Sequence, residues 1–461
     1  MAAPDNKYLK KGKTLLSRTF LTYASMFGMG ASVTILGAAM LDLEILINGP
    51  VTASAVPVRQ TGYFIGAVAG ALMERMWDHQ ISLLLANVLG AISCIFIPLC
   101  SHLTYMLIFI GLMGVCMGLI DTCTNVYIVL LWGKKVANFM QILHMSYGAG
   151  SLIIPVIVTP YLLPVKDDNN DTNSNMTTVE VSLSSSNGSN YSADDVKIKY
   201  PFWMFGAYFL GVTIGFCILA YISPKSKSHE EIFELNAPNS SDESASEPLG
   251  GEAKGDEPKK GSAYIRWLVV LIFGLMSNVC GSVDNSIGTL GPIYGVKSDI
   301  KMSKAEAANV VTLFWALFAF ARLPFILLSS FLGATIMLNV TNIIFMSTVF
   351  IMLPHAMTSE RAYIIALAVI GIGESPIYPA SIGFLQRFVK VTGPMASSFM
   401  ISVCIGKFMY PSLISSYIET MPAMFLYVLS GLILTFSILL IVLEILAFRY
   451  LPPLTKKTAT S

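Results

Sequence analysis

Charged residues are scarce in this sequence. Only 12% of its 461 residues are charged, and the formal net charge is +1. Soluble domains usually carry about 25% charged residues, and a nucleic-acid-binding surface needs a clear basic excess. Hydrophobic residues make up 54% of the chain, more than one water-soluble core of this length can bury. The composition excludes a soluble domain, gives no sign of a nucleic-acid partner, and predicts a protein embedded in the lipid bilayer.

Catalytic and metal-binding motifs are also missing. The sequence contains no Walker loop, no H-E-x-x-H and no G-x-S-x-G in a strand–turn–helix context. Its seven cysteines lie inside or at the ends of apolar runs, and none forms a C-x-x-C pair. We therefore expect no disulfide framework and no metal site, and we predict a protein that is not an enzyme and needs no cofactor.

Apolar runs of about 20 residues recur along the whole length, which is typical of membrane-spanning helices. We predict an all-α membrane protein with twelve transmembrane helices in two pseudo-symmetric halves of six. The first half holds spans at about 18–44, 55–75, 80–100, 103–131, 138–162 and 202–222. The second half holds spans at about 264–292, 306–329, 333–353, 361–386, 394–416 and 422–449.

Two polar inserts define the predicted organisation. The outer loop, 163–201, contains four N-glycosylation sequons, which favour an extracellular or luminal face, at Asn170, Asn175, Asn187 and Asn190. The segment 223–263 is rich in Ser, Glu, Lys and Pro, and we expect a disordered cytoplasmic linker. It separates the N-terminal half, 18–222, from the C-terminal half, 264–449. The ends, 1–17 and 450–461, are predicted to be cytoplasmic tails.

The basic residues give an independent prediction of sidedness. With an even number of spans, both tails share one side of the membrane with most of the loop lysines and arginines, as the positive-inside rule expects for the cytoplasm. Three lysines in an outer loop break this rule, namely Lys297, Lys301 and Lys304. We keep the majority orientation, and we expect a monomer in the plasma membrane with both termini cytoplasmic.

Ionisable residues inside a span cost about 2.5–3.5 kcal/mol each on insertion scales, so they are the first candidates for function. Asp121 lies in the middle of span four, and Asn125 lies one turn away on the same face. A carboxylate beside an amide could bind a coupling cation or the hydroxyls of a sugar. The structural alternative is a buried acid held by an interhelical hydrogen bond.

The C-terminal half offers further candidates. Glu374 and Lys407, in spans ten and eleven, either form a neutral ion pair or open and close it with substrate. Trp315 either stacks on a sugar ring or packs between helices. Asn278 begins a polar stretch that reaches Asp284, which is either a partly unwound segment facing a cavity or the outer end of span seven.

Three other groups complete the candidates. Gln141, His144 and Tyr147 form a polar face on span five, which lines a cavity or packs internally. Asp42 and Glu44 close span one at the outer interface, and Arg322 is expected to anchor the cytoplasmic end of span eight. Glycines at a spacing of four, Gly62, Gly66 and Gly70, predict close helix packing.

The layout resembles the major facilitator superfamily, in which two six-helix halves rock around a site at the membrane midplane. The stretch 62–75, with its Glu74-Arg75, resembles the loop motif of that superfamily after span two. A Gly-x-x-acid pattern recurs in the corresponding spans four and ten, at 118–121 and 371–374. More narrowly, the chain resembles the sodium-dependent glucose transporter 1 group, also called major facilitator superfamily domain-containing protein 4. The matching segments are 35–37, 119–126, 132–133, 140–144, 313–315, 321–322 and 371–379.

This resemblance implies hexose uptake, with Na⁺ as a candidate coupling ion. The group is similar to bacterial fucose–proton symporters, whose acid in span four corresponds to Asp121. Their acid in span one is replaced here by Thr34, and Lys407 stands where an acid is expected in the sodium-dependent relatives. An ammonium beside a cation site would repel sodium, so facilitated diffusion stays open.

We therefore predict an alternating-access transporter of a glucose-like monosaccharide, either sodium-coupled or facilitative, with any coupling ion at Asp121. Carriage of another small polar or organic-ion metabolite is an alternative, as is a non-transporting membrane sensor on the same fold. The predicted substrate site combines residues from both halves, namely Asp121, Asn125, Gln141, His144, Asn278, Trp315, Glu374 and Lys407.

Overall fold

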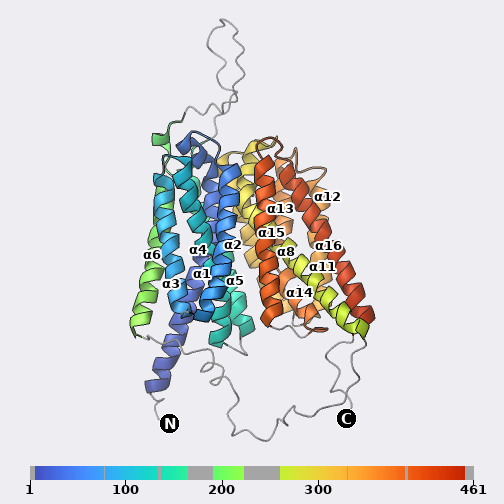
Figure 1. Cartoon of the computed structure of the whole chain (residues 1–461). Helices are drawn as coiled ribbons and strands as arrows, with labels where there is room; N and C mark the ends of the chain where they lie inside the picture. The colour runs from blue at the N-terminus through green and yellow to red at the C-terminus, as the bar shows by residue number, and fades with distance from the viewer. Residues whose placement is uncertain are drawn as a thin grey trace.

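The computed structural model describes residues 6–76, 78–132, 136–164, 191–222, 260–329, 331–389 and 393–451. Within these ranges the regular structure consists of helices alone. Figure 1 shows two helical bundles side by side, the earlier helices in blue and green and the later ones in yellow to red. The four predicted sequons and most of the predicted linker lie outside the described residues, so both stay predictions.

Each span of the N-terminal half is one continuous helix. Their bounds are α1 (Asn6–Ile47), α2 (Thr52–Met76), α3 (His79–Phe96), α4 (Leu103–Trp132), α5 (Val136–Val158) and α6 (Lys199–Ile222). Most ends lie within a few residues of the prediction. The exception is the start of α1, which lies well before residue 18 because lysine and leucine continue a helix as readily as the apolar run does.

Three spans of the C-terminal half are interrupted. The continuous spans are α8 (Lys260–Lys297), α15 (Gly393–Tyr417) and α16 (Met424–Tyr450). The interrupted spans are α9 (Lys304–Phe320) with α10 (Arg322–Ser329), α11 (Ala334–Ser347) with α12 (Val349–Met352), and α13 (Glu360–Glu374) with α14 (Ile377–Leu385). Pro324 and Pro376 lie at two of the breaks, because proline cannot donate the backbone hydrogen bond that a helix interior needs.

Six spans therefore lie in each half. In the described ranges, nine helices are long and apolar enough to cross a membrane on those criteria alone. The start of α1 and the end of α16 lie at the same end of the bundle (Figure 1), as an even number of spans requires. The predicted twelve-helix fold is confirmed.

Glycines bring α2 and α4 into backbone contact. A Cβ added at Gly62 or Gly66 would lie 2.1 or 2.2 Å from a backbone carbonyl of α4. A Cβ at Gly118 on α4 would lie 2.1 Å from the carbonyl of Tyr63. This confirms the close packing that the glycine spacing predicted. It also holds the Tyr63 and Asp121 positions side by side.

The two halves meet along three helix pairs. Across the interface, α1 packs against α8, α2 against α15, and α5 against α9. The helices α1 and α8 approach each other closely at Gly37, where an added Cβ would lie 2.4 Å from the carbonyl of Gly288. The residues that face one another across these pairs are the ones able to respond when the halves move.

Candidate functional site

Asp121 joins the two halves at the centre of the interface. Its Oδ2 accepts a hydrogen bond from the hydroxyl of Tyr63 on α2, and its Oδ1 accepts one from Asn125 Nδ2 at 3.1 Å. The Nζ of Lys407, on α15 of the other half, lies 3.6 Å from Oδ2. The Asp121 and Lys407 side chains are only 15% and 12% exposed. The structure thus brings together three predicted residues, Asp121, Asn125 and Lys407.

Lys407 has a different partner from the one considered in the sequence. Among the described residues no ion pair joins it to Glu374; instead it pairs with Asp121 and donates to the Tyr63 hydroxyl at 3.1 Å. Its ammonium also lies 5.0 Å from the centre of the Tyr63 ring, a cation–π distance. The physical reason is the packing of α15 against α2. Sequence reasoning missed Tyr63, which lies beside Gly62 in the glycine stripe 62–70.

Glu374 belongs to a second charged group, in the C-terminal half. Its side chain is buried, and its Oε2 has no hydrogen-bond partner within the described part of the chain. The Sγ of Cys280 lies 4.0 Å from Oε1. Asp284 and Arg322 are close enough to interact electrostatically with the Glu374 carboxyl. These three ionisable groups lie between α8, α9–α10 and α13.

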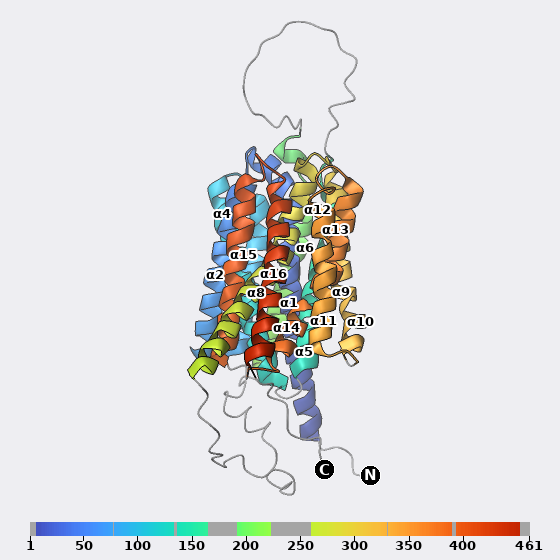
Figure 2. The same cartoon turned by 90° about the vertical axis from the view of Figure 1, so that its right-hand side faces the viewer.

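A cavity of about 240 Å³ lies between the halves. One wall is Gln141 on α5, and the other comes from α10, α11, α14 and the segments beside them. Figure 2 shows α10 and α14 in the lower half of the bundle, nearer the end where the helices lead to the chain termini. The lining residues are Gln141, Arg322, Phe325, Leu332, Ala334, Met337, Ser375, Pro376, Ala380 and Gly383.

Arg322 is a cavity-wall residue, which corrects the prediction of a simple helix anchor. Its guanidinium lies 4.6 Å from the centre of the Phe318 ring, and its Nε has no hydrogen-bond partner among the described residues. The break between α9 and α10 begins at its neighbour Ala321, and this places Arg322 at the start of α10. A charged donor on a cavity wall is available to a ligand.

The polar face of α5 is only partly in the cavity. Gln141 lines it. His144 is half-buried and interacts electrostatically with Arg322, Asp121 and Lys407, so it lies between the two charged groups. Tyr147 is buried with its ring edge-on to Trp315, at 5.4 Å between ring centres.

Trp315 and Asn278 make contacts between helices in this conformation. Trp315 is fully buried among Tyr147, Phe314 and Phe318, so it offers no open ring face, although its Nε1 lacks a hydrogen-bond partner in the described ranges. Asn278 donates to the carbonyl of Ser402 at 2.6 Å and ties α8 to α15. The α8 helix is continuous through the polar stretch, so of the two alternatives for this stretch the partly unwound segment is wrong. Side-chain hydrogen bonds satisfy these polar groups without it.

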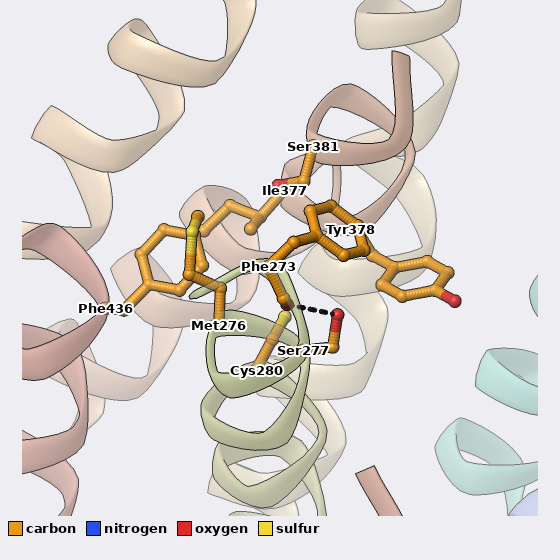
Figure 3. A pocket seen from close by; sticks show the side chains of 8 residues that line it. All are labelled: Phe273, Met276, Ser277, Cys280, Ile377, Tyr378, Ser381 and Phe436. Atoms are coloured by element: carbon orange, nitrogen blue, oxygen red, sulfur yellow. Dashed lines mark hydrogen bonds between the residues drawn. The ribbon is translucent and has the colours of Figure 1, made fainter. Parts of the chain in front are cut away.

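A second void is too small to hold a solute. Figure 3 shows it between α8, α14 and α16, where Ser277 donates to the Phe273 carbonyl. Its volume is about 10 Å³, roughly the room of one water. The void is a packing gap inside the C-terminal half, and the inter-half cavity stays the candidate site.

Ion pairs close the opposite end of the bundle. Lys304 on α9 pairs with Asp42 on α1, and the two side chains are 9% and 0% exposed. Lys297 at the end of α8 pairs with Glu44 at 3.0 Å and with Glu419. Lys297 and Lys304 of the C-terminal half thus each meet an acid of the N-terminal half. Pairing neutralises the charges of Lys297 and Lys304, so these two lysines do not count against the predicted orientation.

Arg59 adds a third contact at this closed end. It is fully buried on α2, where its guanidinium donates to the Val33 carbonyl at 3.2 Å and to Thr289 Oγ1 on α8 at 2.5 Å. Sequence reasoning missed Arg59, although an arginine within the predicted span 55–75 carried the same energetic signal as Asp121. We call Tyr63, Asp121, Asn125 and Lys407 the central cluster. The structure is therefore closed on one side of the central cluster and hollow on the other.

Comparison with known proteins places this architecture in a family. The family model described as Major Facilitator Superfamily matches residues 19–411. The chain belongs to the major facilitator superfamily. It is 26% identical over 401 residues to sodium-dependent glucose transporter 1A of Mus musculus, covering 85% of this chain and 87% of the relative. It is 23% identical over 443 residues to major facilitator superfamily domain-containing protein 4A of Xenopus tropicalis, covering 87% and 86%.

Solved structures share the fold at low sequence identity. A D-xylose–proton symporter superposes with a TM-score of 0.63 at 12% identity, covering 96% of this chain and 99% of the other. The xylose transporter XylE from E. coli, in a partially occluded inward-open conformation, gives 0.63 at 11% identity, covering 97% and 100%. The predictions of a multi-pass membrane transporter with a small-molecule substrate, and of a protein that is not an enzyme, are confirmed by the family.

Proposed function

We propose that the protein is an alternating-access carrier of a glucose-like monosaccharide. One observation carries the proposal: a cavity is lined by Gln141 of the N-terminal half and by residues of the C-terminal half, while ion pairs between the same halves close the other end of the bundle. Such an arrangement exposes a central site to one side of the membrane at a time. The glucose transporters among the relatives support a hexose as the substrate.

The size and chemistry of the cavity agree with a small polar solute. Its volume of about 240 Å³ is below the roughly 300–1,000 Å³ of pockets for drug-sized ligands. Gln141, Arg322 and Ser375 supply donors and acceptors for hydroxyl groups, and Phe325 supplies an apolar face. In this proposal the hollow side is cytoplasmic, so the conformation is inward-facing, and the carrier works in the plasma membrane.

Replacement of Asp121 tests the proposal. Asp121→Asn leaves the Lys407 ammonium inside the membrane without its acid, and breaking a buried pair in this way costs about 3–5 kcal/mol. We expect uptake of labelled glucose into proteoliposomes to fall to background. The matched control is Asp299→Asn in the outer loop, which should transport like the wild type. Unchanged uptake by Asp121→Asn at equal incorporation would contradict the assignment, and binding without flux in the wild type would identify a sensor instead.

Arg322 favours one second candidate, a carrier of small organic anions. Its guanidinium, on the cavity wall, has the geometry to bind a carboxylate. Competition separates the candidates: unlabelled hexoses should reduce labelled glucose uptake, and small carboxylates should not. The reverse pattern would favour the anion carrier.

A further inference from the structure

The Asp121 carboxylate already holds a cation that belongs to the chain. Its Oδ2 faces the Lys407 ammonium at 3.6 Å and accepts from the Tyr63 hydroxyl, while its Oδ1 accepts from Asn125. Tyr63 in turn accepts from Lys407 at 3.1 Å. Each carboxylate oxygen therefore has a donor. The position where a coupling ion would bind Asp121 is the position next to the ammonium.

A sodium ion at this carboxylate would lie a few ångströms from Lys407. Repulsion between two unit charges about 4 Å apart, at the effective dielectric constant of protein sites, weakens binding on the order of 1,000-fold. With its affinity lowered in this way, sodium at millimolar concentration does not displace Lys407 from the Asp121 carboxylate.

The Lys407 ammonium is covalently attached to the chain, and this attachment matters as much as its charge. Lys407 is on α15 and Asp121 is on α4, so the pair crosses the interface that the halves move along. A coupling ion does work because it binds on one side and is released on the other. An ammonium fixed to α15 returns with the protein in every cycle, so no ion gradient drives transport.

We propose that Lys407 is a built-in counter-cation that replaces the coupling ion at Asp121, so that the carrier moves its solute without a sodium or proton gradient. This inference rests on the proposed function. It makes Lys407 a positioning residue that fixes the coupling of the carrier.

Other titratable groups face the pair, and they shape the test. Asp284 on α8 interacts with both Asp121 and Lys407, so a cation could move to it when the lysine is removed. A double variant, Lys407→Gln with Asp121→Asn, therefore assigns any ion response to Asp121. Within the described part of the chain, other groups that interact electrostatically with Asp121 or Lys407 include Tyr63 on α2, His144 and Tyr147 on α5, Cys280 on α8, Tyr378 on α14 and Cys404 on α15.

The experiment measures glucose uptake in proteoliposomes under an inward sodium gradient, an inward proton gradient, or neither. Wild-type uptake should be the same in all three. In Lys407→Gln, uptake without a gradient should fall. A sodium or proton gradient should then raise the uptake of this variant at least five-fold over its uptake without a gradient. Lys407→Arg keeps the tethered charge and should stay independent of ions. Lys197→Gln removes an exposed lysine far from the pair in sequence and should create no ion dependence.

Each outcome separates this inference from the proposed function. No hexose uptake by the wild type under any condition defeats the proposed function. Wild-type uptake that rises with a sodium or proton gradient overturns the inference and leaves the carrier intact. If Lys407→Gln does not transport, its unfolding temperature in detergent with and without sodium, and across pH, replaces the flux assay. Stabilisation by sodium or protons that is absent from the double variant supports the inference, and no stabilisation overturns it.

Discussion

At the residue scale, some members of the central cluster can be predicted from the sequence and others cannot. Asp121 and Lys407 could be found because a charge inside an apolar run is costly. Their pairing could not, because span position gives the depth of a residue but not which neighbouring helix it faces. Tyr63 carried no such signal, since tyrosine is common in membrane helices. The glycines that place it were visible, but the helix they touch was not.

Gly118 offers a direct test of that placement. Gly118→Ala adds a Cβ 2.1 Å from the Tyr63 carbonyl, which forces α2 away from α4 and weakens the hydrogen bond from Tyr63 to Asp121. We expect a loss of about 1–3 kcal/mol in stability, as for other overpacked sites, seen as a lower unfolding temperature and reduced glucose uptake. Gly211→Ala on α6 is the control, because nothing lies within 4 Å of the added atom. Equal behaviour of the two variants would show that the α2–α4 contact is dispensable.

At the scale of helices, the ends and number of spans followed well from hydropathy, but the interruptions did not. Span eight read as one apolar run, although α9 ends at Phe320 and α10 begins at Arg322. Hydropathy averages over a window and does not detect a single lost backbone hydrogen bond, whereas Pro324 and Pro376 carried that information. The break matters for function because it sets the position of Arg322.

The ion pair between α1 and α9 predicts how closure can be released. Lys304→Met leaves Asp42 buried without its cation, which destabilises the closed end by about 3–5 kcal/mol. We expect spin labels at Ala53→Cys and Asp299→Cys, both exposed at that end, to show an added population at longer distance. The charge reversal Asp42→Lys with Lys304→Asp should restore the short distance. A single short population in Lys304→Met would mean that the pair does not hold the halves together.

At the scale of the whole molecule, the arrangement of six plus six helices was predictable because it rests on many residues at once. The predicted sidedness rests on the majority of basic residues and stays a prediction; the acidic partners of Lys297 and Lys304, which depart from that majority, were seen only in the structure. The cavity and the closed end were beyond prediction. They depend on which of several conformations the halves adopt, and composition does not encode that choice.

The orientation can be checked through the sequon loop. If residues 163–201 face outside, the protein expressed in animal cells should carry N-linked glycans, and glycosidase treatment should increase its mobility on a gel. Replacing Asn170, Asn175, Asn187 and Asn190 by Gln should remove the shift. Antibody labelling of intact cells gives a second check. An epitope in this loop that is labelled without permeabilisation, together with a C-terminal epitope that is labelled only after permeabilisation, would support cytoplasmic termini. The opposite labelling would reverse the orientation.

The contact of Gly37 with Gly288 has a consequence for the speed of closure. Ordering a long side chain costs up to about 1.5–2 kcal/mol of rotamer entropy, and glycine has no such cost. The carbonyls on the α8 side lie within a continuous helix, so parting the two helices strips no hydrogen bond from them. The Gly37–Gly288 contact can therefore shut and reopen with no side chain of its own to rearrange, which leaves the Arg59 hydrogen bonds and the ion pairs beside it to set the pace of the cycle.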